Sequence, residues 1–175
     1  VSIVMNPEGT QAIVGSPHLP SGSSPGVGGH VYFYERSWAD PKVWTVTQAL
    51  SDPLASVHAA GAFGYFLSVD KEFLVLAVSS NQNNVLNAPI VPIGTTPSAD
   101  KPAVVFLSID QAGAQLDVNT VQQQILPDLI TTHWLDPLYG AQVALAFEDE
   151  GRSTLRAILT SPMNQQAFYY TLQAS

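Results

Sequence analysis

Apolar and polar residues alternate along much of this chain, and short polar turns interrupt the pattern. The clearest case is 62–80, where apolar positions alternate with small or polar ones up to Val69. A turn follows at Asp70–Glu72, and an apolar run then continues through Phe73–Val78. Two strand-like runs around a short polar turn predict a β-hairpin. We therefore expect two antiparallel strands in the middle of the chain.

The same layout occurs twice more. Residues 1–17 predict a hairpin with its turn at Asn6–Gly9, and residues 139–162 predict another with its turn at Glu148–Gly151. Recurrence of one pattern at a spacing of tens of residues is typical of a repeat architecture. The three hairpins are therefore expected to begin three similar structural units.

Further strands are expected after each hairpin. Aromatic and β-branched residues favour strands, and they predict third strands at Val31–Tyr34, Ala103–Leu107 and Ala167–Leu172. A fourth strand is predicted at Trp44–Leu50, where strict alternation places Trp44, Val46 and Leu50 on one face. Another is expected within 116–126, where an apolar i, i+4 pair also suits a helix but the position in the repeat favours a strand. The last unit has no fourth strand.

These elements predict an all-β fold of three consecutive four-stranded antiparallel units, the third incomplete. The units cover about 1–50, 62–126 and 138–175. Serial four-stranded sheets are the building principle of a β-propeller, in which each sheet is a blade. Because each blade buries its faces on its neighbours, residues 1–175 are expected to form one propeller-type region. A different antiparallel sandwich with recurrent hairpins is the alternative.

Short motifs at the strand ends support the propeller prediction. The second and third hairpins open on Phe63-Gly64 and Tyr139-Gly140, while the first and third close on Gly15-Ser16-Pro17 and Thr160-Ser161-Pro162. This pattern resembles the FG-GAP repeat of integrin α-chain propellers and of many bacterial surface proteins. The resemblance implies an extracellular or cell-surface β-propeller.

The number of units raises the question of closure. Closed propellers have four to eight blades as a rule, so three units with one incomplete cannot close a ring. We therefore expect either a segment of a longer propeller or a ring completed by other chains. An open array also leaves an unpaired sheet edge, which is prone to association. Partners are expected in either case.

The resemblance also implies where a ligand binds. In this family the loops between strands two and three and the loops between blades share one face, and that face binds ligands. The residues that fall in these loops and that we select as candidate binding residues are His58, His133, Trp134 and Asp136. Tryptophan is a common binding anchor. The competing interpretation is that these are ordinary polar loop residues and that Trp134 packs between blades. Trp38 and Trp44 are expected to pack within a turn or strand.

Charge and composition exclude several classes of function. The chain has 6 Lys and Arg residues against 14 Asp and Glu residues, a net charge of −8. Phosphate neutralisation dominates nucleic-acid binding, and basic segments bind anionic lipids, so neither partner is expected. No apolar run is long enough for a transmembrane helix, so membrane insertion is not expected. The absence of cysteine excludes disulfides, thiolate metal sites and cysteine nucleophiles.

Candidate chemistry is sparse. The histidines lack metal-ligand spacing, and no Gly-x-Ser-x-Gly elbow or phosphate-binding glycine loop occurs. We therefore expect no catalytic residues, no metal site and no cofactor. Calcium is the one ion with a partial candidate, because family calcium loops lie in the first hairpin turn and Glu148, Asp149 and Glu150 approach that pattern.

The sequence thus predicts a non-enzymatic extracellular or cell-surface module for adhesion or assembly. It would recognise protein or glycan through the loops between blades and between strands two and three. The alternative is a propeller-based polysaccharide hydrolase or lyase, with a carboxylate pair drawn from Asp52, Asp136 and Glu148.

Overall fold

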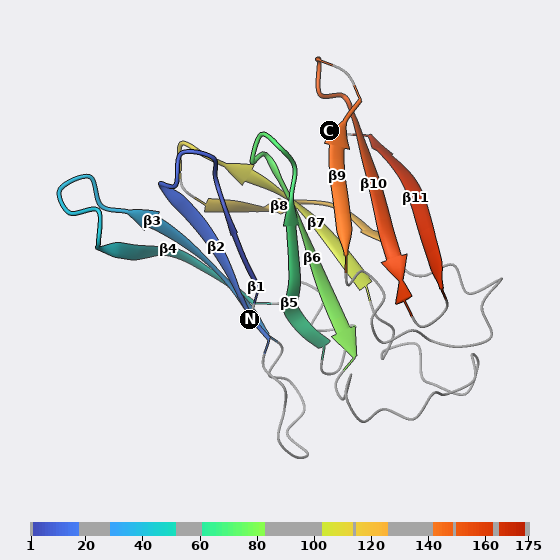
Figure 1. Ribbon diagram of the computed structural model, residues 1–175, viewed down its shortest axis with the longest axis horizontal. Coiled ribbons are helices and arrows are strands. Elements are labelled where there is room, and N and C mark those ends of the chain that lie inside the picture. The colour runs from blue at the N-terminus through green and yellow to red at the C-terminus, as the bar shows by residue number, and fades with distance from the viewer. Residues whose placement is uncertain are drawn as a thin grey trace.

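A computed structural model describes the strands and most of their turns. The described residues are 2–17, 29–51, 61–82, 103–113, 115–125, 142–148, 150–162 and 165–173. They form three antiparallel sheets without an α-helix (Figure 1). None of these residues belongs to a helix of the length and apolarity needed to cross a membrane. The predicted all-β antiparallel class is confirmed.

Each sheet consists of strands that follow one another in the chain. Sheet 1 has the order β1 (Ser2–Met5), β2 (Gln11–Ser16), β3 (His30–Arg36) and β4 (Trp44–Ser51). Sheet 2 has the order β5 (Gly61–Val69), β6 (Val75–Gln82), β7 (Ala103–Asp110) and β8 (Gln115–Ile125). Sheet 3 has the order β9 (Val143–Phe147), β10 (Thr154–Ser161) and β11 (Gln166–Gln173). The segment within 116–126 is therefore a strand, as its position in the repeat predicts.

Sheet 2 is buried on both faces. In β6, Leu76 and Val78 pack against sheet 1, whereas Val75 and Ala77 pack against sheet 3. Strand β7 alternates in the same way, with Val105 and Leu107 toward sheet 1 and Val104 and Phe106 toward sheet 3. A strand that is buried on both faces has apolar residues at consecutive positions, rather than alternating apolar and polar residues. This explains the unbroken run through Phe73–Val78 in the sequence.

Two separate cores result, and the three sheets lie in a row (Figure 1). Sheet 1 contributes to the first core the fully buried Ile13, Val31 and Phe33. Sheet 3 contributes to the second core Leu155, Ala157, Leu159 and Leu172. Sheet 2 is the common partner of both, so it joins the sheets into one body.

Backbone contact between glycines sets the spacing of sheets 1 and 2. A Cβ atom added to Gly15 in β2 would overlap the carbonyl oxygen of Gly64 in β5, and one added to Gly29 would overlap the carbonyl oxygen of Phe63. Gly64 has a φ of +84°, which favours glycine, and its added Cβ would lie 2.7 Å from the His30 carbonyl oxygen. The two sequence motifs, Phe63-Gly64 and Gly15-Ser16-Pro17, thus meet at one sheet-to-sheet contact.

Glutamine side chains fasten sheets 1 and 2 at their periphery. The Gln48 amide in β4 forms two hydrogen bonds with the Leu116 backbone in β8, donating to the carbonyl at 2.9 Å and accepting from the N–H at 2.6 Å. At the end of the sheets that carries the hairpin turns (the turn end), Gln11 Nε2 donates across to the Gln111 carbonyl at 2.8 Å. Within sheet 2, Gln111 Nε2 donates to the Glu72 carbonyl at 2.7 Å. These bonds satisfy backbone groups that ladder pairing leaves open.

The first two hairpin turns are built alike around one side-chain acceptor. In the β1–β2 turn, Asn6 Oδ1 accepts hydrogen bonds from the Thr10 and Gln11 N–H groups. In the β5–β6 turn, the buried Asp70 carboxylate accepts from the N–H groups of Glu72, Leu74 and Val75 at 2.7–2.9 Å. Asn and Asp suit such turns because their short side chains reach the backbone a few residues ahead.

Phe73 departs from the sequence prediction, which placed it in a strand. It lies in the β5–β6 turn with a φ of 58°, and β6 begins at Val75. Its side chain is buried in the first core, where its ring meets the Phe33 ring edge-on at 6.2 Å. A left-handed φ is uncommon for a bulky residue, and burial of the ring between two sheets offsets that conformational cost.

The predicted face of β4 is wrong because a bulge shifts the register. Leu50 pairs with Val31 and packs against the first core, whereas Val46 pairs with Tyr34 on the opposite face and is 46% exposed. The register shifts between Phe33 and Tyr34. One extra residue on a strand transfers every later side chain to the other face, which strict alternation cannot reveal.

Substitution of Gly15 tests the glycine contact. Gly15→Ala should destabilise the chain by about 3 kcal/mol, because the new methyl overlaps a backbone atom that cannot move away independently. Thr160→Ala is the matched control, since Thr160 is the corresponding residue in the Thr160-Ser161-Pro162 motif and should cost at most about 1 kcal/mol. Urea unfolding of both variants measures the difference. Equal losses would show that the spacing does not depend on Gly15.

Substitution of Asp70 tests the turn acceptor. Asp70→Ala should cost about 2–3 kcal/mol, because three N–H groups lose a partner at a site that is 3% exposed. Asp70→Asn keeps one amide oxygen in the role that Asn6 has in the first hairpin, so we expect a loss of about 1 kcal/mol. Thermal unfolding of the two variants, followed by circular dichroism, compares them. A similar loss for both would contradict the role of the acceptor.

Candidate functional site

The binding residues selected from the sequence lie outside the described residues. These are His58, His133, Trp134 and Asp136. The described strand ends nevertheless define where their segments attach. Ser16, His30 and Ser51 lie in one register row at the end of sheet 1, and the ends of β8 and β9 flank the segment with Trp134. The candidate loops therefore leave the sheets at the end opposite to the hairpin turns.

The candidate calcium turn contains one half of an ion pair. The exposed Glu148 carboxylate pairs with the Arg156 guanidinium, and this hydrogen bond raises the pKa of Arg156 above its usual value. Asp149 lies outside the described residues, while Glu150 is exposed. Among the described residues, no group of three or more His, Cys, Asp or Glu side chains is arranged to hold a metal ion. Calcium at this turn stays a prediction.

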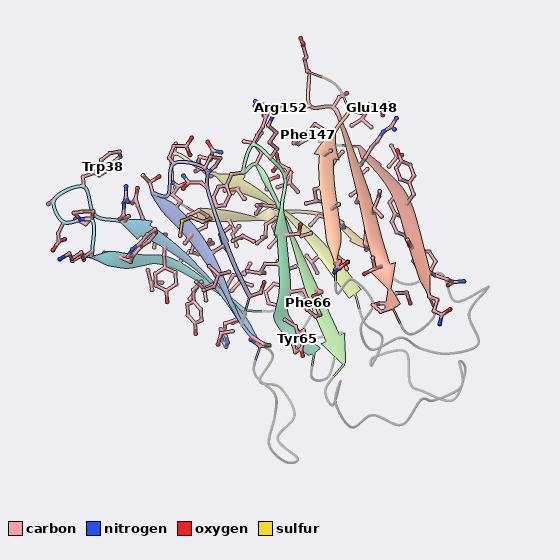
Figure 2. The ribbon with its side chains drawn as sticks, viewed as in Figure 1. Trp38, Tyr65, Phe66, Phe147, Glu148 and Arg152 are labelled. Carbon is pink, nitrogen blue, oxygen red and sulfur yellow. The ribbon has the colours of Figure 1, made fainter. Side chains whose placement is uncertain are left out.

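A second ion pair joins this turn to sheet 2. Arg152, which has a φ of 55°, pairs with Glu72 in the β5–β6 turn. Figure 2 shows Arg152 and Glu148 at the turn end of the molecule, close to the boundary between sheets 2 and 3. Both partners are about half exposed, with side-chain exposures of 52% and 48%. Exposed pairs of this kind contribute little to stability, so this one adds only a weak link between the two turns.

The outer face of sheet 1 is apolar and aromatic. Two of the register rows on this face are apolar, and their members are Ile3, Val14 and Tyr32 in one and Met5, Ala12, Tyr34 and Val46 in the other. Along β3 the His30 and Tyr32 rings stack at 6.0 Å, and the Tyr32 and Tyr34 rings follow at 6.5 Å. Ile3 is 62% exposed and Met5 is 50% exposed. No other described element covers this face.

The outer face of sheet 3 also exposes apolar side chains. Ile158 and Tyr169 form a cross-strand pair at its centre, and they are 45% and 55% exposed. Ala144 pairs with Ile158 from the other side, which completes the row. The Arg156 guanidinium lies over the Tyr169 ring, 5.7 Å from its centroid. This face is therefore apolar at its centre, with a charged group toward the turn end.

The structure also contradicts the packing that the sequence predicts for Trp38. It lies in the β3–β4 turn and is 88% exposed, although packing was expected (Figure 2). The turn is closed by backbone hydrogen bonds between Ser37 and Val43 and between Val43 and Asp40, so it needs no side-chain packing. A side chain at a hairpin tip has few neighbours, which accounts for the exposure of Trp38.

Comparison with known proteins assigns neither a family nor a function to this chain. No protein-family model, no curated protein and no solved structure matches it. The candidate surfaces, chosen from the structure, are the two outer sheet faces and the end of the sheets to which the loops attach.

The exposure of Trp38 leads to a simple prediction. Trp38→Ala should change the free energy of unfolding by less than about 0.5 kcal/mol, because a side chain that is 88% exposed has little packing to lose. Denaturant unfolding at low protein concentration measures the change. A loss above about 1 kcal/mol would mean that the indole packs against the fold.

Proposed function

We propose that this chain is a segment of three consecutive β-propeller blades that serves as a non-enzymatic binding or assembly module. In this proposal each sheet is one blade, and the third blade lacks its outer strand. The observation that carries the proposal is the serial stacking of the sheets, with the middle sheet buried on both faces. This burial is what a blade inside a propeller requires, because each blade has a neighbour on either side.

The contacts between first strands agree with this arrangement. Strand β5 contacts β1, β2 and β3 of the preceding sheet and β9 of the following one. The first strands β1, β5 and β9 therefore lie in sequence along one side of the row. In a propeller the first strand of each blade lies near the central axis, so neighbouring first strands meet.

The glycine contact gives the family resemblance a physical reason. Phe63-Gly64 opens the second unit and Gly15-Ser16-Pro17 closes the first hairpin, and the two motifs touch where sheets 1 and 2 approach most closely. A repeat that stacks on its neighbour through the backbone needs a small residue in both places. The motif spacing in the sequence thus supports stacking between blades.

Binding is assigned to the end of the sheets to which the long connecting segments attach. The segments 18–28, 52–60, 83–102 and 126–141 all join strands at that end. Loops on a rigid scaffold commonly carry recognition residues. Trp134 is the proposed anchor, and His58, His133 and Asp136 are the further proposed binding residues. The proposed ligand is a protein or a glycan of the extracellular environment, and no cofactor is required.

A binding screen tests this assignment. The chain is immobilised and exposed to a panel of extracellular polysaccharides and matrix proteins, with affinity measured by surface plasmon resonance. Trp134→Ala should weaken binding of the ligand found by at least about tenfold, as expected when an aromatic anchor is removed. Trp38→Ala is the matched control, because it removes an indole at the opposite end of the sheets and should leave the affinity unchanged.

Two results would contradict the proposal. One is equal loss of binding in both tryptophan variants, which would move the site away from the loop end. The other is release of reducing sugar ends when the chain is incubated with the same polysaccharides. That result would favour the alternative, a propeller-based hydrolase or lyase.

A further inference from the structure

The large exposed apolar side chains of the described residues are gathered in few places. Apart from Trp38 and Val43 in the β3–β4 turn, they lie on the outer face of sheet 1 or on the outer face of sheet 3. Those on sheet 1 are Ile3, Met5 and Val46, and those on sheet 3 are Ile158 and Tyr169. The two ends of the row of sheets therefore carry the apolar surface that a stacked neighbour would cover.

The repeat shows which buried positions these exposed residues correspond to. The sequence Ala12-Ile13-Val14-Gly15-Ser16-Pro17 in β2 aligns without a gap on Ala157-Ile158-Leu159-Thr160-Ser161-Pro162 in β10. The strand pairing follows the same alignment, since Ile13 pairs with Phe33 and Ile158 pairs with Tyr169. Apart from Thr160, which stands at the position of Gly15, the outer face of sheet 3 thus corresponds to the face of sheet 1 that is buried against sheet 2.

The central pair of this face is buried in the two preceding sheets. Ile13 and Phe33 are 0% exposed in the first core, and the corresponding pair in sheet 2, Ala77 and Phe106, is buried in the second core. Only in sheet 3 is the pair, Ile158 and Tyr169, open to solvent. The outer face of sheet 3 therefore resembles two buried faces: the face of sheet 1 that packs against sheet 2, and the face of sheet 2 that packs against sheet 3.

The outer face of sheet 1, at the opposite end of the row, corresponds to the face of sheet 3 that packs against sheet 2. In sheet 3, Phe168 and Tyr170 stack at 6.4 Å and pack against sheet 2. In sheet 1 the aligned residues of the third strand are Tyr32 and Tyr34, whose rings lie 6.5 Å apart on the outer face. The outer face of sheet 1 is therefore built like the face through which sheet 3 docks on sheet 2.

We propose that a second copy of this chain docks through the outer face of its sheet 1 onto the outer face of sheet 3, and so continues the stack head to tail. One chain carries both complementary surfaces, each equivalent to a face already used between its own sheets, so no other partner is needed. The contact is heterologous, because two different surfaces meet. Heterologous contacts close into a ring when the rotation between copies allows it, and otherwise extend as a filament.

Arg156 marks the rim of this interface. It occupies the position of Gln11, which is 7% exposed and bonds across to the turn of the following sheet. Arg156 is already paired with Glu148 and lies over Tyr169, so its charge is balanced before docking. A paired charge at the turn end and an apolar centre match the usual division of an interface into core and rim.

The inference rests on the proposed blade-like stacking, and it is tested by association rather than by ligand binding. Sedimentation velocity of the full chain over a wide concentration range should show association. Met5→Lys on sheet 1 and Ile158→Lys on sheet 3 should each weaken association by roughly a hundredfold, because an unpaired ammonium would enter an apolar contact. Val43→Lys is the control, because it places the same charge on an exposed residue outside both faces.

Mixing the two variants distinguishes a head-to-tail contact from a symmetric one. Each variant alone keeps one intact face, so an equimolar mixture of Met5→Lys and Ile158→Lys should form a one-to-one dimer and nothing larger. Thermal unfolding checks that each variant is folded, and Val46→Lys and Tyr169→Lys replace any variant that is not. A dimer abolished by only one of the two substitutions would indicate a symmetric contact and overturn the proposal.

Three other results would also overturn it: a monomer at every concentration, association that both variants leave intact, or a native polypeptide heavier than 18.7 kDa whose further sheets cover both faces. The outcomes separate the two proposals. A monomeric chain that still binds its ligand through Trp134 rejects only the second copy. An associating chain without ligand binding rejects only the proposed binding function.

Discussion

Burial of sheet 2 on both faces is the constraint on which the rest of the structure depends. Strands β6 and β7 direct apolar side chains to each side, so sheet 2 exposes a large apolar surface unless both neighbours are present. Burying a large apolar side chain contributes about 1.5–3 kcal/mol, and Leu76, Val105 and Phe106 are each 0% exposed. The outer sheets are thereby fixed by the middle one, and their own outer faces are left open.

Much of the fold could be predicted from the sequence, because each sheet is formed by strands that follow one another. Local alternation and polar turns are sufficient to locate a meander of this kind. The prediction of three hairpins, of a strand within 116–126 and of a three-stranded last sheet agrees with the observed elements. The departures are local. The bulge in sheet 1 transfers Val46 to the outer face, and Phe73 adopts a left-handed turn because its ring is held between sheets.

The candidate surfaces were harder to foresee. Alternation tells which residues share a face of a strand, but it does not tell whether another sheet covers that face. Ile13 and Ile158 occupy equivalent positions in hexapeptides that share four of six residues, yet one is 0% exposed and the other is 45% exposed. The difference arises only from their place in the row of sheets. The loop residues proposed for binding, such as Trp134, rest on the family resemblance and on where the strands end.

The pairing of each strand with its neighbour in the chain also has a consequence for how the molecule folds. Most ladder contacts within a sheet join residues close in sequence, the exception being β6 and β7, which pair across the segment 83–102. Contacts between sheets span longer distances, such as Gln48 to Leu116. Local contacts close small loops at low entropic cost and form early. The strand pairs that short turns join are therefore expected to form before the sheets dock on one another, and sheet 2 must dock with both of the others to bury its two faces.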